Sequence, residues 1–260
     1  MNDHEKPRFE AMLHDLEVVD DWAERLDPDT PKPPIGQRSP LAADDRKLDP
    51  YQLSHASWWA LSHAVDHLHM HRNVLRDAAV IHRQSHYTLL RGAFENASAA
   101  VWMLAPPSRA ERVCRRLRFA ALDIRNGDRV RALVGVPAPR TAVERLNQLK
   151  DIAQRAGVDE KRAIERVSFL EIVKAAGEHT AIGERRAQMI WNMCSGSAHG
   201  DFWAMASMVE RIDLPGAPDG IVQSRVTANI DLMAHLTGYA VAMTKYGWAY
   251  YDKRATEHFA

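Results

Sequence analysis

Apolar residues recur at intervals of three and four along most of the chain, the spacing that places side chains on one face of an α-helix. The pattern predicts an N-terminal helix over residues 7–26 and long helices over 51–81, 83–105, 108–133, 180–208 and 227–253, with shorter helices between 141 and 177. No sustained alternation of apolar and polar residues predicts a β-strand, although residues 221–226 could form a short extended segment. We therefore expect an all-α fold, an up-and-down helical bundle.

Residues that cap or break helices mark the expected boundaries. Ser108, Thr141 and Ser168 each stand three positions before a glutamate, the pattern of a capping box that opens a helix. Six prolines lie between residues 27 and 50, and because proline lacks a backbone donor this segment is expected to be an extended connector. The chain is thus predicted to comprise an N-terminal helix (1–26), a proline-rich connector (27–50) and a helical-bundle domain (51–260).

The amino-acid composition indicates how large a core can form, whether nucleic acid could bind and where in the cell the protein is expected. With 46% hydrophobic residues in a chain of 260, a large core can form, and because 34 basic side chains balance 34 acidic ones, any attraction to nucleic acid must come from local clusters. The charged start of the chain differs from a secretory signal, and Cys114 and Cys194 lack the spacing of a disulfide framework, which favours a cytoplasmic location. The apolar stretches 97–105 and 228–251 are too short or are interrupted by charges, so no membrane-spanning segment is expected.

Two of the expected helices carry polar residues beside their apolar faces. Arg91 and Glu95 lie one turn apart on the helix 83–105, while Asn192, Ser195 and His199 follow one flank of the helix 180–208. If the two helices are neighbours, these residues form a polar seam inside the bundle. The seam has two interpretations: an active site in which His199 is an acid or base with Glu95 as its partner, or a set of hydrogen bonds that fixes helix register.

The stretches 87–95 (YTLLRGAFE) and 191–200 (WNMCSGSAHG) resemble those of a set of uncharacterised bacterial helical proteins and, more distantly, the HEPN superfamily. That resemblance implies a helical bundle, often dimeric, from toxin–antitoxin or phage-defence systems, and in many members metal-independent ribonuclease activity. His199 matches the family histidine and Glu95 the charged residue of an earlier helix, whereas Asn192 stands where the family has arginine. Because an amide carries no positive charge for the transition state, the resemblance leaves catalysis open.

Arginines recur along the helix 108–133. Its apolar face places Arg115, Arg118, Arg125 and Arg129 on the outer side, over about 20 Å of helix. Such a face is a candidate docking surface for the phosphates of a nucleic acid. The alternative is a solvated face whose charges are balanced by neighbouring acidic residues.

Histidines are concentrated on the first long helix. His63, His67 and His71 are spaced four apart, as in helical metal sites. They point away from the apolar face of that helix, however, and no Glu-x-x-His pattern in a long helix supplies facing carboxylates. We therefore expect neither a metal nor another cofactor.

The same polar face carries Trp59, Met70 and Val74. An apolar strip opposite the core-facing side has to be covered, either by the N-terminal helix or by a second subunit. The strip is thus one reason to expect a homodimer.

Together these features predict an intracellular helical-bundle protein, an RNA-associated or partner-binding module of a defence or toxin–antitoxin type. The alternative, from a different class, is a small-molecule binding protein. In that case Trp102, Trp191 and Trp203 would line a pocket in the bundle, with Glu95 and His199 as its polar groups.

Overall fold

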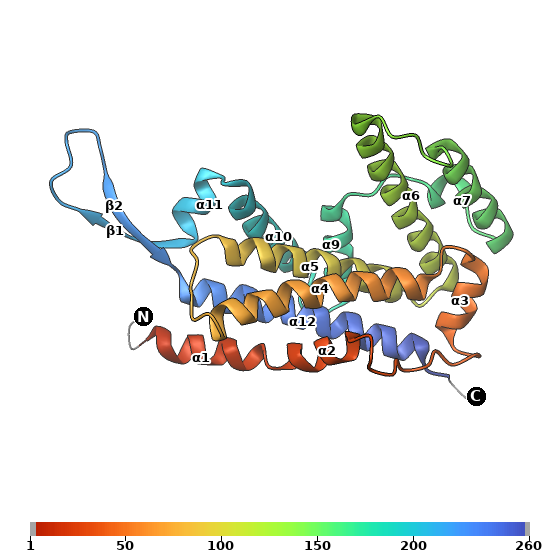
Figure 1. Ribbon diagram of the computed structural model, residues 1–260, viewed down its shortest axis with the longest axis horizontal. Coiled ribbons are helices and arrows are strands. Elements are labelled where there is room, and N and C mark those ends of the chain that lie inside the picture. The colour runs from red at the N-terminus through yellow and green to blue at the C-terminus, as the bar shows by residue number, and fades with distance from the viewer. Residues whose placement is uncertain (1–3, 258–260) are drawn as a thin grey trace.

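Helices form an elongated body from which one β-hairpin projects (Figure 1). The computed structural model describes residues 4–257. The elements are α1 (Glu5–Asp15), α2 (Val18–Leu26), α3 (Pro40–Leu48), α4 (Leu53–Arg76), α5 (Ser85–Leu104), α6 (Arg109–Val134), α7 (Ala142–Ala156), α8 (Glu160–Ala163), α9 (Phe169–Glu178), α10 (Glu184–His199), α11 (Phe202–Ser207), β1 (Val209–Leu214), β2 (Gln223–Ala228) and α12 (Ile230–Ala255). The predicted all-α class and bundle character are confirmed.

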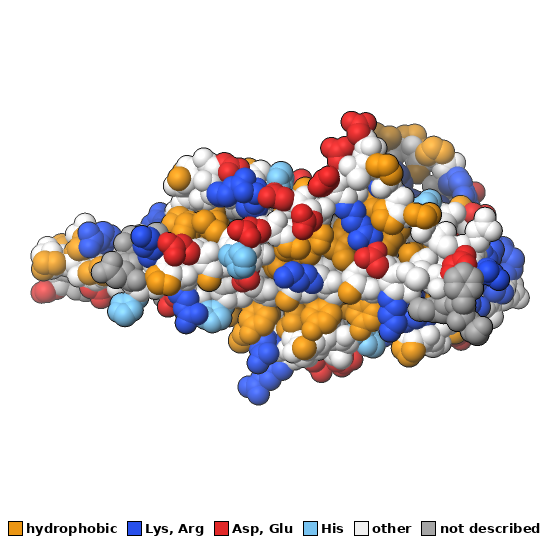
Figure 2. Space-filling model, turned by 90° about the horizontal axis from the view of Figure 1, so that it is seen from below, with side chains coloured by type: hydrophobic (Ala, Val, Ile, Leu, Met, Phe, Trp, Pro, Cys, Tyr) orange, Lys and Arg blue, Asp and Glu red, His pale blue; other side chains and the backbone are white. Residues whose placement is uncertain are grey.

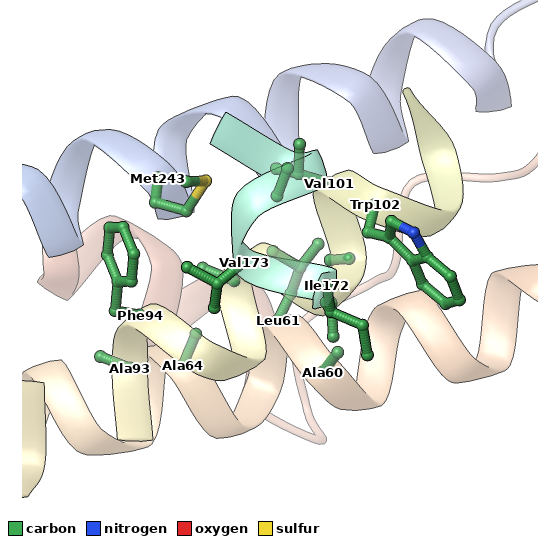
Figure 3. Packing of buried hydrophobic residues seen from close by; sticks show 14 of the residues in the cluster. Ala60, Leu61, Ala64, Ala93, Phe94, Val101, Trp102, Ile172, Val173 and Met243 are labelled. Carbon is green, nitrogen blue, oxygen red and sulfur yellow. The ribbon is translucent and has the colours of Figure 1, made fainter. Parts of the chain in front are cut away.

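Helix α5 lies at the centre of the body. It packs against α4, α12, α9 and α10, and its last eight residues, from Ala97 to Leu104, are all buried. Figure 3 shows the core that results, in which Phe94 and Val101 of α5 meet Leu61 of α4 and Met243 of α12. This central packing of α4, α5 and α12 fixes the frame on which the other helices lie.

The second group of helices gathers around α6 at one end of the body (Figure 1). The first half of α6 buries Val113, Leu117 and Ala121, while its last turns expose Leu133 and Val134. Helices α3, α7 and α8 pack along it.

The N-terminal region differs from its prediction in two ways. The expected helix 7–26 is two helices, of which α1 lies mainly along α12 and α2 along α4. The expected extended connector contains α3, so that part of the prediction is wrong. Ser39 caps α3 by accepting a hydrogen bond from the backbone amide of Ala42, and Pro40 occupies the first turn, where its missing donor costs nothing.

The predicted capping signals open helices where expected. Thr141 and Ser168 form complete capping boxes, and Ser108 accepts a hydrogen bond from the Glu111 amide at 3.4 Å. The expected helix 180–208, in contrast, ends at Gly200, whose φ of 74° is left-handed. Phe202, which follows this break, is 82% exposed on α11.

The chain after α11 forms a hairpin that the sequence pattern did not predict in full. Strand β1 pairs antiparallel with β2, from Val209 opposite Ala228 to Leu214 opposite Gln223. The expected extended segment 221–226 overlaps β2, whereas β1 was not predicted. No helix in the described part of the chain combines the length and apolar character needed to cross a membrane.

Candidate functional site

The expected polar seam is formed in part. Arg91 Nε lies 2.9 Å from Glu95 Oε1, and the indole Nε1 of Trp191 donates to the same oxygen at 2.6 Å. The Arg91 guanidinium also lies over the Trp191 ring, 5.7 Å from its centroid. These contacts fasten α10 to α5, as the register interpretation of the seam expects.

His199, in contrast, lies apart from Glu95. Helix α10 runs antiparallel to α5, since Trp191 meets Glu95 whereas the Ser197 hydroxyl bonds to the side chain of Gln84. At a rise of 1.5 Å per residue, Gln84 and Glu95 are about 16 Å apart along the helix axis. His199 follows Ser197, at the exposed last residue of α10, so the expected pairing of His199 with Glu95 is not made.

The two other predicted site residues of α10 differ in their exposure to solvent. Ser195 is buried, and Asn192 is exposed. Gly196, next to Ser195, lies against the ring of Trp203, because α11 folds back on α10 after Gly200. A catalytic role of His199 therefore stays a prediction, without Glu95 as its partner.

Three of the four arginines predicted to form an open face are engaged within the protein. Arg115 pairs with Glu111 at 2.8 Å, Arg118 donates to the carbonyl of Arg166 at 3.1 Å, and Arg125 donates to the carbonyl of Ile164 at 2.6 Å. The segment after α8 thus covers this side of α6. Sequence periodicity places residues on a helix face but not the segment that covers the face, which is why this prediction was incomplete.

A groove with aromatic walls runs between α4 and α6. It encloses about 570 Å³, with Ala60 and Ala120 on its floor. The aromatic residues that line it are Tyr51, Trp59, Phe119 and Phe169. Trp59 is 65% exposed, so its ring is available to a ligand. We call this hollow the aromatic groove.

A second hollow, of about 440 Å³, continues the aromatic groove along α6. Leu122 and Asn126 line both hollows, so the two are adjacent. Arg125, Arg129 and Arg166 are among the residues that line the second hollow, and we call it the basic hollow.

Electrostatics in the basic hollow favour an anion. The Arg125 Nη1 atom is buried and has no hydrogen-bond partner among the described residues, and burial together with the nearby Arg166 lowers the pKa of Arg125. The carboxylate of Glu171 also lines the hollow, but it accepts hydrogen bonds from the amide and the hydroxyl of Ser168, each at 2.7 Å. A bound anion would relieve the repulsion between the arginines.

A third hollow, of about 760 Å³, lies beyond the basic hollow and shares Arg125 and Arg166 with it. Lys150, Lys161 and Arg162 line it, with Glu160 and Glu165 as the acidic residues. The three hollows therefore follow one another, from aromatic walls to a surface rich in positive charge. Of the predicted nucleic-acid-binding arginines, Arg125 and Arg129 lie on this path.

One of the histidines of α4 lies on a different side of that helix from the side that the sequence predicted. His71 is completely buried, with Nδ1 2.9 Å from His86 Nδ1 and Nε2 3.0 Å from the Thr237 hydroxyl. The expectation that His71 points away from the core is wrong, because α5 and α12 cover that side of α4. Within the described residues, no three His, Cys, Asp or Glu side chains are gathered so that they could hold a metal ion.

Two residues of the apolar strip that was expected to be covered are exposed to solvent. Trp59 and Met70 are exposed, at 65% and 53%, because α2 packs on another side of α4 and α1 lies mainly along α12. The three tryptophans that were expected to line a small-molecule pocket each contact different residues. Trp102 is covered by Arg115 and Arg118, while Trp191 binds Glu95 and Trp203 lies on Gly196.

Comparisons with known proteins give no relative from which a function could be taken. No family model, curated protein or solved structure matches the chain. The resemblance to the HEPN superfamily, carried by Glu95 and His199, therefore stays a prediction, and what the structure establishes is the helical character of the fold.

Proposed function

We propose that this protein is an RNA-associated binding module that holds a single strand in the path formed by the aromatic groove and the basic hollow. The observation that carries the proposal is the adjacency of the two hollows, which share Leu122 and Asn126. A nucleotide combines a planar base with a phosphate, and a ligand of this kind fits aromatic walls beside clustered arginines.

The chemistry of each part matches one part of a nucleotide. Trp59 and Phe169 offer ring faces on which a base stacks, a contact worth about 1–3 kcal/mol per base. Arg129 and Arg166 offer donors for the oxygens of a phosphate. The third hollow, with Lys150 and Lys161, continues the path for a following phosphate. That continuation supports a strand over a single small molecule.

The other parts of the proposal follow from the sequence. The distant HEPN resemblance supports RNA as the nucleic acid and a defence or toxin–antitoxin setting in a bacterial cytoplasm. The proposal includes self-association as a homodimer. It does not include catalysis, since Asn192 stands where the family has arginine and the Glu95 carboxylate is engaged by Arg91 and Trp191.

Fluorescence anisotropy with a labelled single-stranded RNA of about ten nucleotides tests the proposal. Replacing Arg129 and Arg166 by Gln should weaken binding for all sequences and reduce the slope of log Kd against log salt by roughly 0.7 per lost contact. Trp59→Ala should weaken binding about 10-fold with an unchanged salt slope, because it removes stacking and no charge.

Matched controls lie outside the path. Arg155→Gln removes an exposed arginine of α7, and Trp203→Ala removes a half-exposed tryptophan of α11, and neither should change RNA affinity. Unchanged affinity in the Arg129/Arg166 variant would contradict the proposal. Equal affinity for a mononucleotide and for the RNA strand would favour the small-molecule alternative.

A further inference from the structure

The β-hairpin projects from the end of the body opposite α6 and α7 (Figure 1). Of the sixteen large hydrophobic side chains exposed among the described residues, seven lie between residues 202 and 222. Ile212 and Leu214 on β1 are 55% and 40% exposed, and Figure 2 shows hydrophobic side chains on the narrow projection. An isolated two-stranded hairpin is marginally stable in water, so this arm lacks the strands that would normally support it.

Within the described residues the arm is a two-stranded sheet, and the outer edge of β1 therefore has backbone groups that no other strand bonds. Such an edge is a template for pairing with another strand. A second copy of the chain offers an identical edge, and two identical edges pair antiparallel about a two-fold axis.

Charges along β1 select one register for this pairing. With the two-fold axis at Ile212, Arg211 lies opposite Asp213 of the partner subunit, and symmetry makes the same pair a second time. Ile212 then faces its own copy across the interface. Opposite charges and apolar pairs at facing positions stabilise an antiparallel sheet.

The neighbouring registers are disfavoured. A shift of the axis to Arg211 or to Asp213 places two like charges face to face. The outer edge of β2 has a single charged residue, Arg225, and cannot form an opposite-charge pair with itself.

We propose that the chain dimerises by antiparallel pairing of β1 with β1 of a second copy, which gives a four-stranded sheet with Ile212 at its two-fold axis. The proposal rests on the self-association included in the proposed function and specifies its surface. In the separate chain Arg211 Nε lies 3.0 Å from Asp213 Oδ1 of the same strand, both half-exposed. On pairing, each exchanges this contact for one across the interface.

Sedimentation velocity on the full chain tests the pairing. The unaltered protein should be a dimer. Arg211→Asp and Asp213→Arg each place like charges face to face in a homodimer, so each alone should weaken dimerisation roughly 10- to 100-fold. An equimolar mixture of the two variants should recover the dimer, because each acidic strand then faces a basic one. The double variant with both changes should also be a dimer.

Three outcomes would overturn the pairing: an unaltered protein that is monomeric at all concentrations, single variants that dimerise as strongly as the unaltered protein, or a mixture that stays monomeric. Far-UV circular dichroism should match in all variants, because the altered residues are exposed on the arm. Loss of RNA binding in the Arg129/Arg166 variant is measured separately and should leave the dimer intact, so failure of the pairing is distinguishable from failure of RNA binding.

Discussion

Buried polar side chains decide much of the chemistry at the scale of single residues. His71, His86 and Thr237 join α4, α5 and α12 through two hydrogen bonds inside the core. Burial lowers the pKa of His71 to about 3, helped by the nearby His86, and lowers that of His86 to about 4, helped by His82. Both imidazoles are therefore neutral in the folded protein at physiological pH.

This neutrality predicts a loss of stability in acid. The unfolded chain takes up protons on these histidines below a pH of about 6.5, whereas the folded chain does so only near the lowered pKa values. The free energy of unfolding should therefore fall as the pH drops from about 6.5 towards 4, by roughly 1 kcal/mol per histidine for each pH unit. Urea unfolding at about pH 7.5 and about pH 5 measures the effect.

Replacing both His71 and His86 by Gln keeps polar groups at these positions but removes the titration. The double variant should lose about 2–4 kcal/mol less than the unaltered protein between the two pH values, even where its absolute stability is lower. His63→Gln, on the exposed face of α4, controls for the loss of an imidazole. An equal pH dependence in the double variant and the unaltered protein would count against the buried pair.

At the scale of elements, α3 shows how one buried ion pair fixes a short helix. Arg112 of α6 donates to both carboxylate oxygens of Asp44 in α3, at 2.6 and 3.1 Å, and to the carbonyls of Pro106 and Pro107. Asp44 is completely buried, and burial raises the pKa of its carboxyl group despite the neighbouring arginine. The ion pair holds α3 against α6. Removing one partner would leave an unpaired buried charge, which is strongly destabilising.

Arg112→Met should therefore lower the free energy of unfolding by about 3–5 kcal/mol, because it leaves the Asp44 carboxylate buried without its main partner. Arg109 also approaches Asp44, at 3.2 Å, but it is about half exposed, so Arg109→Gln should cost less than about 1 kcal/mol. Chemical denaturation of the two variants gives the comparison. Similar losses in both would show that burial does not set the strength of this contact.

The sequence correctly predicted where helices begin when nearby residues in the chain cap them. Thr141 and Ser168 open helices as predicted, because a capping box needs only two residues three positions apart. The signal for α3, Ser39 followed by Pro40, is also local, but the surrounding prolines favoured an extended connector. The break at Gly200 was missed because the apolar spacing continues through Phe202, which is exposed.

The candidate site depended on contacts that the sequence could not supply. Arg125 and Arg129 were predicted to bind nucleic acid, and Trp59 was predicted to need a cover. That these residues lie along one path follows only from the positions of Phe169 and Arg166 beside α6, which come from a segment about forty residues later in the chain. A helical period gives the face of a residue and leaves its distant neighbours undetermined.

At the scale of the whole molecule, the arm and the binding path lie at opposite ends of the body (Figure 1). A dimer joined at β1 would therefore present two binding paths that are far apart and free of the interface. A long RNA that reaches both paths is held twice, and its second attachment is intramolecular. A short RNA fills one path and gains nothing from the second subunit.

We therefore expect the dimer to bind long RNA more tightly than the Arg211→Asp variant does, by about 100-fold once the strand spans both paths. Below that length the two proteins should bind equally, since Arg211 lies on the arm and not on the path. Anisotropy measured over a series of RNA lengths, at one salt concentration, tests this. A ratio of affinities that stays near one at every length would contradict the bivalent arrangement, because avidity requires a length at which the second site comes within reach.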